Sequence, residues 1–91
     1  MEFEWDPNKA ASNLTKHKVS FREAATVFRD PLSITFDDPD HGDDKDRSIT
    51  IGTSSGGRLL IVAHTDRGMR IRIISARETT STERDLYEEG Q

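Results

Sequence analysis

The sequence predicts an α+β fold in which N-terminal helices pack on one face of a four-stranded, mainly antiparallel sheet that is followed by a C-terminal helix. Two observations carry this prediction. Apolar residues recur at helical spacing as far as residue 30, and from residue 32 the spacing changes to the period of two that is typical of strands. The chain has 91 residues, 32% of them hydrophobic, so we expect a single domain over 1–91 with a modest core.

The N-terminal part predicts a short extended piece at residues 3–5 and two helices. In the first helix, Asp6 can cap the free amides and Pro7 suits the first helical position, and the helix runs to about His17. Ser20 and Glu23 form a capping box at the start of the second helix. The apolar stripe of this second helix consists of Phe21, Ala24, Ala25 and Phe28, and "DP" at 30–31 ends it.

Four strands and a last helix follow. The strands are expected at residues 32–36, 48–54, 58–65 and 70–77, which are rich in isoleucine and threonine. The turn "DRG" gives Gly68 the freedom to take a positive φ. The last helix starts with a second capping box, Thr80 and Glu83, and Gly90 is a candidate C′ residue.

Strand alternation predicts which side chains share a face of the sheet. With three-residue turns at 54–56 and 66–68, the odd positions face the helices: Ile49, Ile51, Leu59, Ile61, Ala63, Ile71 and Ile73. The even positions then share the open face: Thr50, Arg58, Leu60, Val62, His64, Arg70, Arg72 and Ile74. This register places His64 across from Arg70 and Val62 across from Arg72, and it leaves Arg77 at the rim near the last helix.

The charges are segregated along the chain. The net charge is −4, yet residues 37–46 contain six aspartates against one lysine, whereas residues 58–77 contain five arginines against one aspartate. Guanidinium groups bind phosphates in a bidentate manner, so the open face is a candidate site for a polyanion. The alternative is that these arginines only keep the sheet soluble and cover apolar surface with their stems.

Two histidines are candidates for proton transfer. His64, beside the arginine pair of the predicted register, would have its pKa lowered by like-charge repulsion and could act as a base near neutral pH. His17 lies with Lys16 at the end of the first helix, where the helix dipole alone explains a group of cations.

Several classes of site are disfavoured. The chain has no cysteine, which excludes disulfides and thiolate metal sites. The acidic segment fails the calcium-loop pattern because Pro39 stands where an oxygen ligand is required and Ser48 where a glutamate is required. No phosphate loop, serine-hydrolase elbow or zinc-protease motif occurs, so no metal or cofactor is expected. No membrane span or secretory signal is visible, and we expect a cytoplasmic protein.

One family resemblance covers residues 3 to 90. "FEWDPNKAASNLTKHKVSFREAATVF" followed by "DP", "ISAR" and "ER..YEEG" resembles the BrnT toxins of bacterial type II toxin–antitoxin pairs. The chain departs from the family at Lys18, where the family usually has glycine. The resemblance implies a fold similar to that of RelE and ParE toxins, and a ribonuclease that arrests translation by cutting RNA. It also implies a BrnA-type antitoxin that forms a hetero-oligomer with the toxin and connects it to operator DNA.

The resemblance also gives matching positions, and we assign only some of these to the site. The positions that match the family are Lys16, His17, Arg47, Arg67, Arg72, Arg77, Glu83, Arg84 and Tyr87. Metal-free RNA cleavage needs a base, an acid and stabilisation of the phosphorane. We assign Arg72 and Arg77 to the phosphorane and Arg67 to positioning the backbone, with Lys16, His17 or His64 moving protons. The remaining RNA contacts are assigned to Arg47, Arg58, Arg70 and Tyr87.

A hypothesis of a different class stays open. The arginine face could belong to a binding module without enzymatic activity, which docks an acidic antitoxin segment or nucleic acid.

Overall fold

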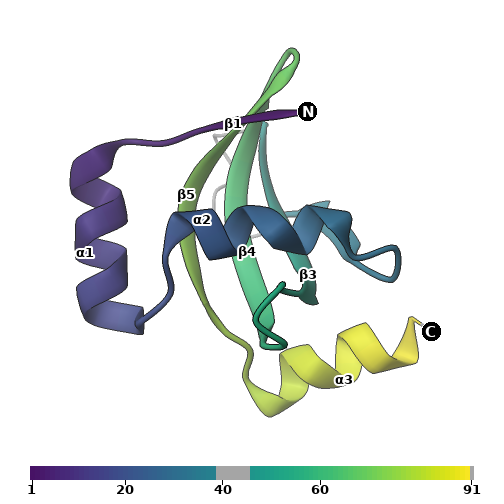
Figure 1. Ribbon diagram of the computed structural model, residues 1–91. Coiled ribbons are helices and arrows are strands. Elements are labelled where there is room, and N and C mark those ends of the chain that lie inside the picture. The colour runs from purple at the N-terminus through teal and green to yellow at the C-terminus, as the bar shows by residue number, and fades with distance from the viewer. Residues whose placement is uncertain (39–45, 91) are drawn as a thin grey trace.

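The computed structural model describes residues 1–38 and 46–90 (Figure 1). The elements are β1 (Glu2–Glu4), α1 (Pro7–His17), α2 (Phe21–Ala25), the 3-10 helix η1 (Thr26–Arg29), β2 (Ile34–Asp37), β3 (Arg47–Thr53), β4 (Leu59–Arg67), β5 (Arg70–Glu78) and α3 (Ser81–Glu89). Residues 39–45 of the acidic segment lie outside the described residues.

The strands form one five-stranded sheet in the order β1-β5-β4-β3-β2. β1 runs parallel to β5 and the other neighbours are antiparallel, so the sheet is mixed. The α+β class is confirmed, but the four-stranded sheet is corrected to five strands because the extended piece near residue 3 pairs with the edge of β5. A strand of three residues is too short for its pattern to predict a partner. Figure 1 shows α2 crossing the front of the sheet, α1 beside β5 and α3 at the end of the sheet.

The helices begin where the capping residues predict. Asp6 accepts a hydrogen bond from the Asn8 amide at 2.8 Å, and Ser20 accepts one from the Glu23 amide at 3.0 Å. The second helix is shorter than predicted, since its regular part ends at Ala25 and continues as η1. At α3 both hydrogen bonds of the capping box with Thr80 are present.

The end of α1 is unusual. Lys18 caps the helix in the left-handed conformation, with φ 60 and ψ 29, and it is the one non-glycine residue with positive φ in the described chain. A side chain with a Cβ is strained in that conformation, which is the reason that helices prefer glycine here. The departure from the family's glycine therefore falls at the position where glycine fits best. At the end of α3, by contrast, Gly90 has φ −74 and is not a left-handed C′ residue.

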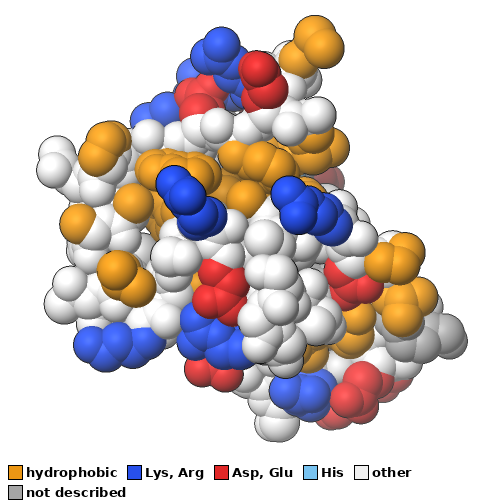
Figure 2. All heavy atoms as spheres, viewed as in Figure 1, with side chains coloured by type: hydrophobic (Ala, Val, Ile, Leu, Met, Phe, Trp, Pro, Cys, Tyr) orange, Lys and Arg blue, Asp and Glu red, His pale blue; other side chains and the backbone are white. Residues whose placement is uncertain are grey.

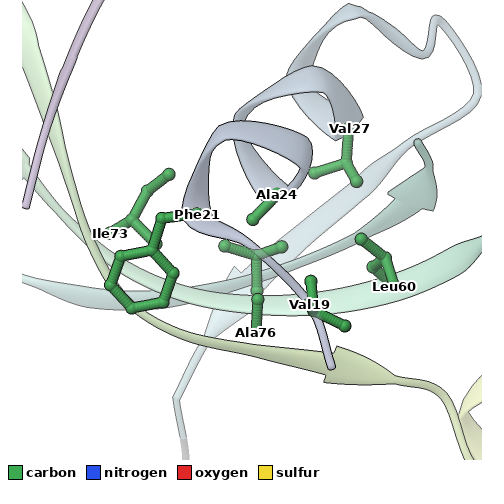
Figure 3. Close-up of a cluster of buried hydrophobic side chains, with 8 residues drawn as sticks. Val19, Phe21, Ala24, Val27, Leu60, Ile73 and Ala76 are labelled. Carbon is green, nitrogen blue, oxygen red and sulfur yellow. The ribbon is translucent and has the colours of Figure 1, made fainter. Parts of the chain in front are cut away.

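The main core lies between α2 and the sheet (Figure 3). Its buried members come from the α1–α2 link, α2, η1, β4 and β5: Val19, Phe21, Ala24, Val27, Leu60, Val62, Ile73 and Ala76. Phe3, Trp5, Ala10, Ala25 and Phe28 pack around it. This cluster fixes α2 across the middle of the sheet.

A smaller cluster lies on the opposite face of the sheet. Ile51, Leu59 and Ile61 are buried there, with Ile34, Ile49 and Tyr87 packed against them. Because Tyr87 belongs to α3, the terminal helix covers part of the face that the sequence left open.

The predicted facing of β3 and β4 is therefore wrong. Leu60, Val62 and His64 point towards α2, whereas Ile49, Ile51, Leu59, Ile61 and Ala63 belong to the other face. For Ile71 and Ile73 the prediction is confirmed, since Ile73 lies in the main core. Strand β4 has large apolar residues on both faces, so its pattern did not distinguish one face from the other, and the facing of β3 follows from its pairing with β4.

The register between β4 and β5 explains the error. Arg67 pairs with Arg70 across a tight turn, whereas the predicted turn at 66–68 pairs Thr65 with Met69. Farther along, the pairing shifts between Ala63 and His64, so that β5 has one extra residue, Ile74, in a β-bulge. His64 consequently lies across from Ile73 and not from Arg70, and Val62 lies across from Ala76 and not from Arg72.

Candidate functional site

Three arginines gather where β4 turns into β5. Arg67 and Arg70 are cross-strand partners, and Arg72 follows two residues farther along β5, so all three share one face. That face is opposite to α2, because Ile71 and Ile73, which alternate with the arginines, point towards the helices. The predicted position of Arg70 and Arg72 away from the helices is confirmed.

Strand β1 places a carboxylate beside each of two arginines. Glu2 and Glu4 are in register with Arg70 and Arg72, with Nε–Oε2 and Nη1–Oε2 distances of 3.3 and 2.8 Å. Exposed ion pairs contribute about 1 kcal/mol or less, so a phosphate can compete for these guanidinium groups. Arg67 forms no ion pair within residues 1–38 and 46–90.

Arg77 is bound to the start of α3. Its two terminal nitrogens donate to the two carboxylate oxygens of Glu83, both at 2.8 Å, and Oε1 of Glu83 also accepts from the Thr80 amide. These hydrogen bonds, the one from Arg77 first, hold the pKa of Glu83 below its ordinary value. Since Arg77 pairs with Ile61, it lies on the same face as Arg72, near the predicted rim.

The contacts of Arg58 connect elements of the fold. Its Nε donates to Glu23 at 3.1 Å, and Nη2 donates to the Lys18 carbonyl at 3.0 Å. The hydrogen bond from Arg58 is the main reason that the pKa of Glu23 is lowered. Arg58 lies next to the β3–β4 turn, at the end of β4 that is remote from Arg67, so the structure does not bring it to the arginine group.

Arg47 and Arg72 flank a buried hydroxyl that the sequence analysis missed. Thr65 pairs with Arg47 on one side and with Arg72 on the other, so the three side chains share a face. The Oγ1 atom of Thr65 is buried and has no hydrogen-bond partner among the described residues. Arg47 itself is held by Asp38 at 3.1 Å. The two guanidinium groups, and not the buried hydroxyl, are the groups of this trio that can donate to an acceptor outside the protein.

Lys16 and His17 line a polar hollow between α1 and the outer edge of β5. The hollow has Ile74 and Ser75 of β5 on one side, and Lys9 and Ser12 complete it on α1. The sequence analysis missed Lys9 and Ser12, although they precede Lys16 by seven and four residues and so lie on the same helix face. The bulge residue Ile74 is thus beside the two predicted proton-transfer groups.

His64 does not belong to either group of cations. It is only 2% exposed, packs at right angles on Phe28 with ring centroids 4.9 Å apart, and bonds Thr50 Oγ1 through Nε2 at 2.8 Å. Burial lowers its pKa, while Asp66 at 3.4 Å partly opposes that effect. The argument for His64 as a base relied on neighbouring arginines, and since those lie on the other face, that argument is wrong.

Tyr87 holds α3 against the rest of the molecule. Its hydroxyl donates to Asp30 at 2.6 Å, and the same carboxylate oxygen accepts from the Thr53 amide at 2.8 Å. The hydrogen bond to Asp30 is the main reason that the pKa of Tyr87 is raised. Its contacts are those of a residue that fixes a helix.

In the part of the chain that the structure describes, no group of three or more histidine, aspartate and glutamate side chains has the arrangement of a metal site. No helix in the same part is long and apolar enough to cross a bilayer.

Comparison with known proteins gives a family. Residues 5–83 match the family model described as the ribonuclease toxin BrnT of type II toxin–antitoxin systems. The fold is similar to the crystal structure of the Brucella abortus ribonuclease toxin BrnT, with a TM-score of 0.70 and 23% identity over 89% of this chain and 99% of that chain. No curated protein sequence matches. The family match spans α1, α2 and the strands of the arginine face, and the chain therefore belongs to the BrnT family of ribonuclease toxins.

Proposed function

We propose that this protein cleaves RNA internally without a metal ion, arrests translation in the cytoplasm, and is neutralised by a BrnA-type antitoxin. Its membership of a ribonuclease toxin family of type II toxin–antitoxin systems supports an RNA substrate and an antitoxin partner. The residues that carry out the reaction are assigned here from the geometry of β5 and α1.

The observation that carries the proposal is the arrangement around the bulge in β5. Lys16 and His17 lie in the hollow beside Ile74 and Ser75. Arg72 precedes this pair by two residues and Arg77 follows it by two, which corresponds to about 7 Å along a strand. The proposal therefore assigns the proton-transfer groups and the anion-binding groups to one short stretch of β5 and to the part of α1 beside it.

The reaction follows from these groups. His17, as neutral imidazole, takes the proton of the 2′-hydroxyl while the 2′-oxygen attacks the adjacent phosphorus. Arg72 and Arg77 stabilise the charge of the phosphorane electrostatically, since a guanidinium remains protonated at any working pH. The bond from phosphorus to the 5′-oxygen breaks, and Lys16 gives that oxygen a proton. The products are a 2′,3′-cyclic phosphate and a 5′-hydroxyl.

The other cations of the open face bind neighbouring phosphates. Arg67 and Arg70 are at the exposed end of the hairpin and suit the backbone of the RNA strand. Arg47 and Thr65 extend the same face towards β3. The contacts of Arg58, Tyr87 and His64 favour structural roles, so we do not include these three in the proposed reaction.

Purified protein tests the proposal. We expect cleavage of single-stranded RNA in the presence of EDTA, with cyclic-phosphate ends. His17→Ala should reduce the cleavage rate by about 100-fold or more, since general acid–base groups contribute on that scale. Arg84→Ala, which removes an exposed arginine of α3, is the matched control. Cleavage that stops in EDTA, or 3′-hydroxyl products, would contradict the proposed chemistry.

The ion pairs of Arg70, Arg72 and Arg77 count against their use on a phosphorane, and they leave a binding module without enzymatic activity as the alternative. Inducible expression separates the ribonuclease from the binding module. A ribonuclease should stop growth and bulk translation, and Arg72→Ala combined with Arg77→Ala should abolish both effects. A binding module should leave growth unchanged whether the natural protein or the double variant is expressed.

A further inference from the structure

An apolar groove lies between α1 and α2, on the side of α1 that faces away from Lys9 and Lys16. It is lined by Trp5, Ala10, Ala11, Leu14 and Phe21, together with Ser20 and Arg22. Figure 2 shows hydrophobic side chains gathered over α1 and α2, with lysine or arginine side chains resting on them. The two surfaces of α1 are distinct, because Ala10 and Leu14 lie on the opposite helix face from Lys9 and Lys16.

The groove exposes one large apolar side chain that lies outside the main core, Leu14. Leu14 is 49% exposed, although Ala10, one turn earlier, packs against the main core. Trp5 and Phe21 form the aromatic part of the groove, with ring centroids 6.0 Å apart at 76°. A contiguous apolar patch on a small protein is typical of an interaction site.

One cation, Arg22, lines the groove, and a second, Lys18, lies in the link between α1 and α2. Arg22 and Lys18 are exposed, and neither forms an ion pair among the residues that the structure describes. The nearby carboxylates are already engaged, since Asp6 caps α1 and Glu23 binds Arg58. The arginines of β5 differ in this respect, because Glu2, Glu4 and Glu83 pair with them.

We propose that this groove is the docking surface for an acidic, amphipathic segment of the antitoxin. Apolar side chains of that segment would occupy the space beside Leu14 and Phe21, and its carboxylates would pair with Arg22 and Lys18. Charge complementarity selects this occupant, since the groove offers unpaired cations around apolar ground. The inference rests on the proposed function only in taking the antitoxin as the partner.

Four variants test the proposal with a BrnA-type antitoxin. Leu14→Glu and Arg22→Glu place negative charge in the groove, and neither residue belongs to the proposed catalytic machinery. Leu86→Glu and Arg84→Glu are matched controls on α3, where Leu86 is 46% exposed. Circular dichroism establishes that each variant folds, calorimetry measures antitoxin affinity, and induced expression with and without antitoxin measures growth arrest and rescue.

We expect the groove variants to stop growth as the natural protein does, but to bind the antitoxin at least tenfold more weakly and to escape rescue. The controls should bind and be rescued normally. Unchanged affinity in both groove variants would overturn the proposal, and so would a loss of affinity in the α3 controls. If Arg22→Glu abolished RNA cleavage but kept its affinity for the antitoxin, the groove would be a binding site for RNA and not for the antitoxin. If Leu14→Glu dissociated a dimer of the protein without affecting antitoxin affinity, its occupant would be a second copy.

The failure of this proposal is distinguishable from that of the proposed function. Without growth arrest by the natural protein, the enzymatic proposal fails, yet calorimetry still decides whether the antitoxin uses the groove.

Discussion

Asn13 completes the hydrogen bonding of Ala76 at the exposed edge of the sheet. Its side-chain amide donates to the Ala76 carbonyl at 2.9 Å, and its side-chain carbonyl accepts from the Ala76 amide at 3.1 Å. A neighbouring strand would supply the same pair, but β1 pairs with β5 only as far as Arg72. The same amide also donates to the Val19 carbonyl at 2.9 Å, so Asn13 connects α1, the link to α2 and β5.

Replacing this side chain should be costly. Asn13→Ala leaves three buried backbone groups without partners, and we expect a loss of about 3 kcal/mol in the free energy of unfolding, since each such group costs roughly 1–3 kcal/mol. Urea denaturation measures the loss. Asn8→Ala, at an exposed position of the same helix, should change stability by less than about 0.5 kcal/mol. A loss below about 1 kcal/mol for Asn13→Ala would mean that water replaces the amide.

The strained end of α1 should be improved by glycine. Lys18→Gly removes the cost of a left-handed Cβ residue, which is about 1–2 kcal/mol, but it adds flexibility to the unfolded chain. We expect a net gain of about 0.5–1 kcal/mol in thermal unfolding experiments. The bond from Arg58 uses the Lys18 carbonyl and is retained. Lys16→Gly, inside the same helix, should instead lower stability by about 1 kcal/mol. Equal effects of the two substitutions would contradict the left-handed conformation.

The burial of His64 should make stability depend on pH. Its pKa in the folded protein is below the ordinary value of 6.5, so the unfolded chain binds a proton first as the pH falls through 6.5. Stability is therefore lost between pH 6.5 and the lower folded pKa. Glu23 and Glu83 act in a separate window, since their pKa values start from 4.5 and are lowered further.

His64→Gln is the variant that checks this dependence. Glutamine keeps a hydrogen-bonding group for Thr50 but does not titrate. We expect the urea midpoint of the natural protein to fall from pH 7 to about 5, and that of the variant to change much less over the same range. If the urea midpoints of the natural protein and the variant fell equally over this pH range, a group other than His64 would cause the pH dependence.

The pair formed by Arg77 and Glu83 should limit the affinity for RNA. Glu83→Gln keeps a residue that suits the capping box of α3 and removes the negative charge from Arg77. We expect RNA to bind about three- to tenfold more tightly in a fluorescence assay, with a steeper salt dependence, because one more cation is available to a phosphate. Glu88→Gln, in contact with Arg84 at 3.9 Å, is the control. If Glu83→Gln bound RNA with unchanged affinity, Arg77 would not contact the bound RNA.

Local signals in the sequence predicted local structure well. Asp6, Ser20 and Thr80 act within three residues of their own position, and each caps its helix as expected. The capping box at Ser20 is only half formed, because Glu23 turns to Arg58, which is 35 residues away in the chain. Information about such distant partners is not contained in a local pattern.

The same limit applies to the candidate site. Lys16 and His17 were found through their neighbours in the chain, and the structure places them together in one hollow. Glu4, 68 residues from Arg72, was not identified as its partner. The facing of β4 and the position of His64 depended on a turn and a bulge that hydrophobic spacing does not reveal, because β4 is apolar on both faces.

The bulge at Ile74 also affects how related sequences are to be read. In a regular strand, residues five apart point to opposite sides, yet Arg72 and Arg77 share a side because one residue between them does not count in the pairing. A relative whose two arginines are separated by three residues would achieve the same arrangement with an uninterrupted ladder. Four residues stand between Arg72 and Arg77 in this sequence. The number of residues between the two arginines therefore distinguishes a strand with the bulge from a regular strand in an alignment.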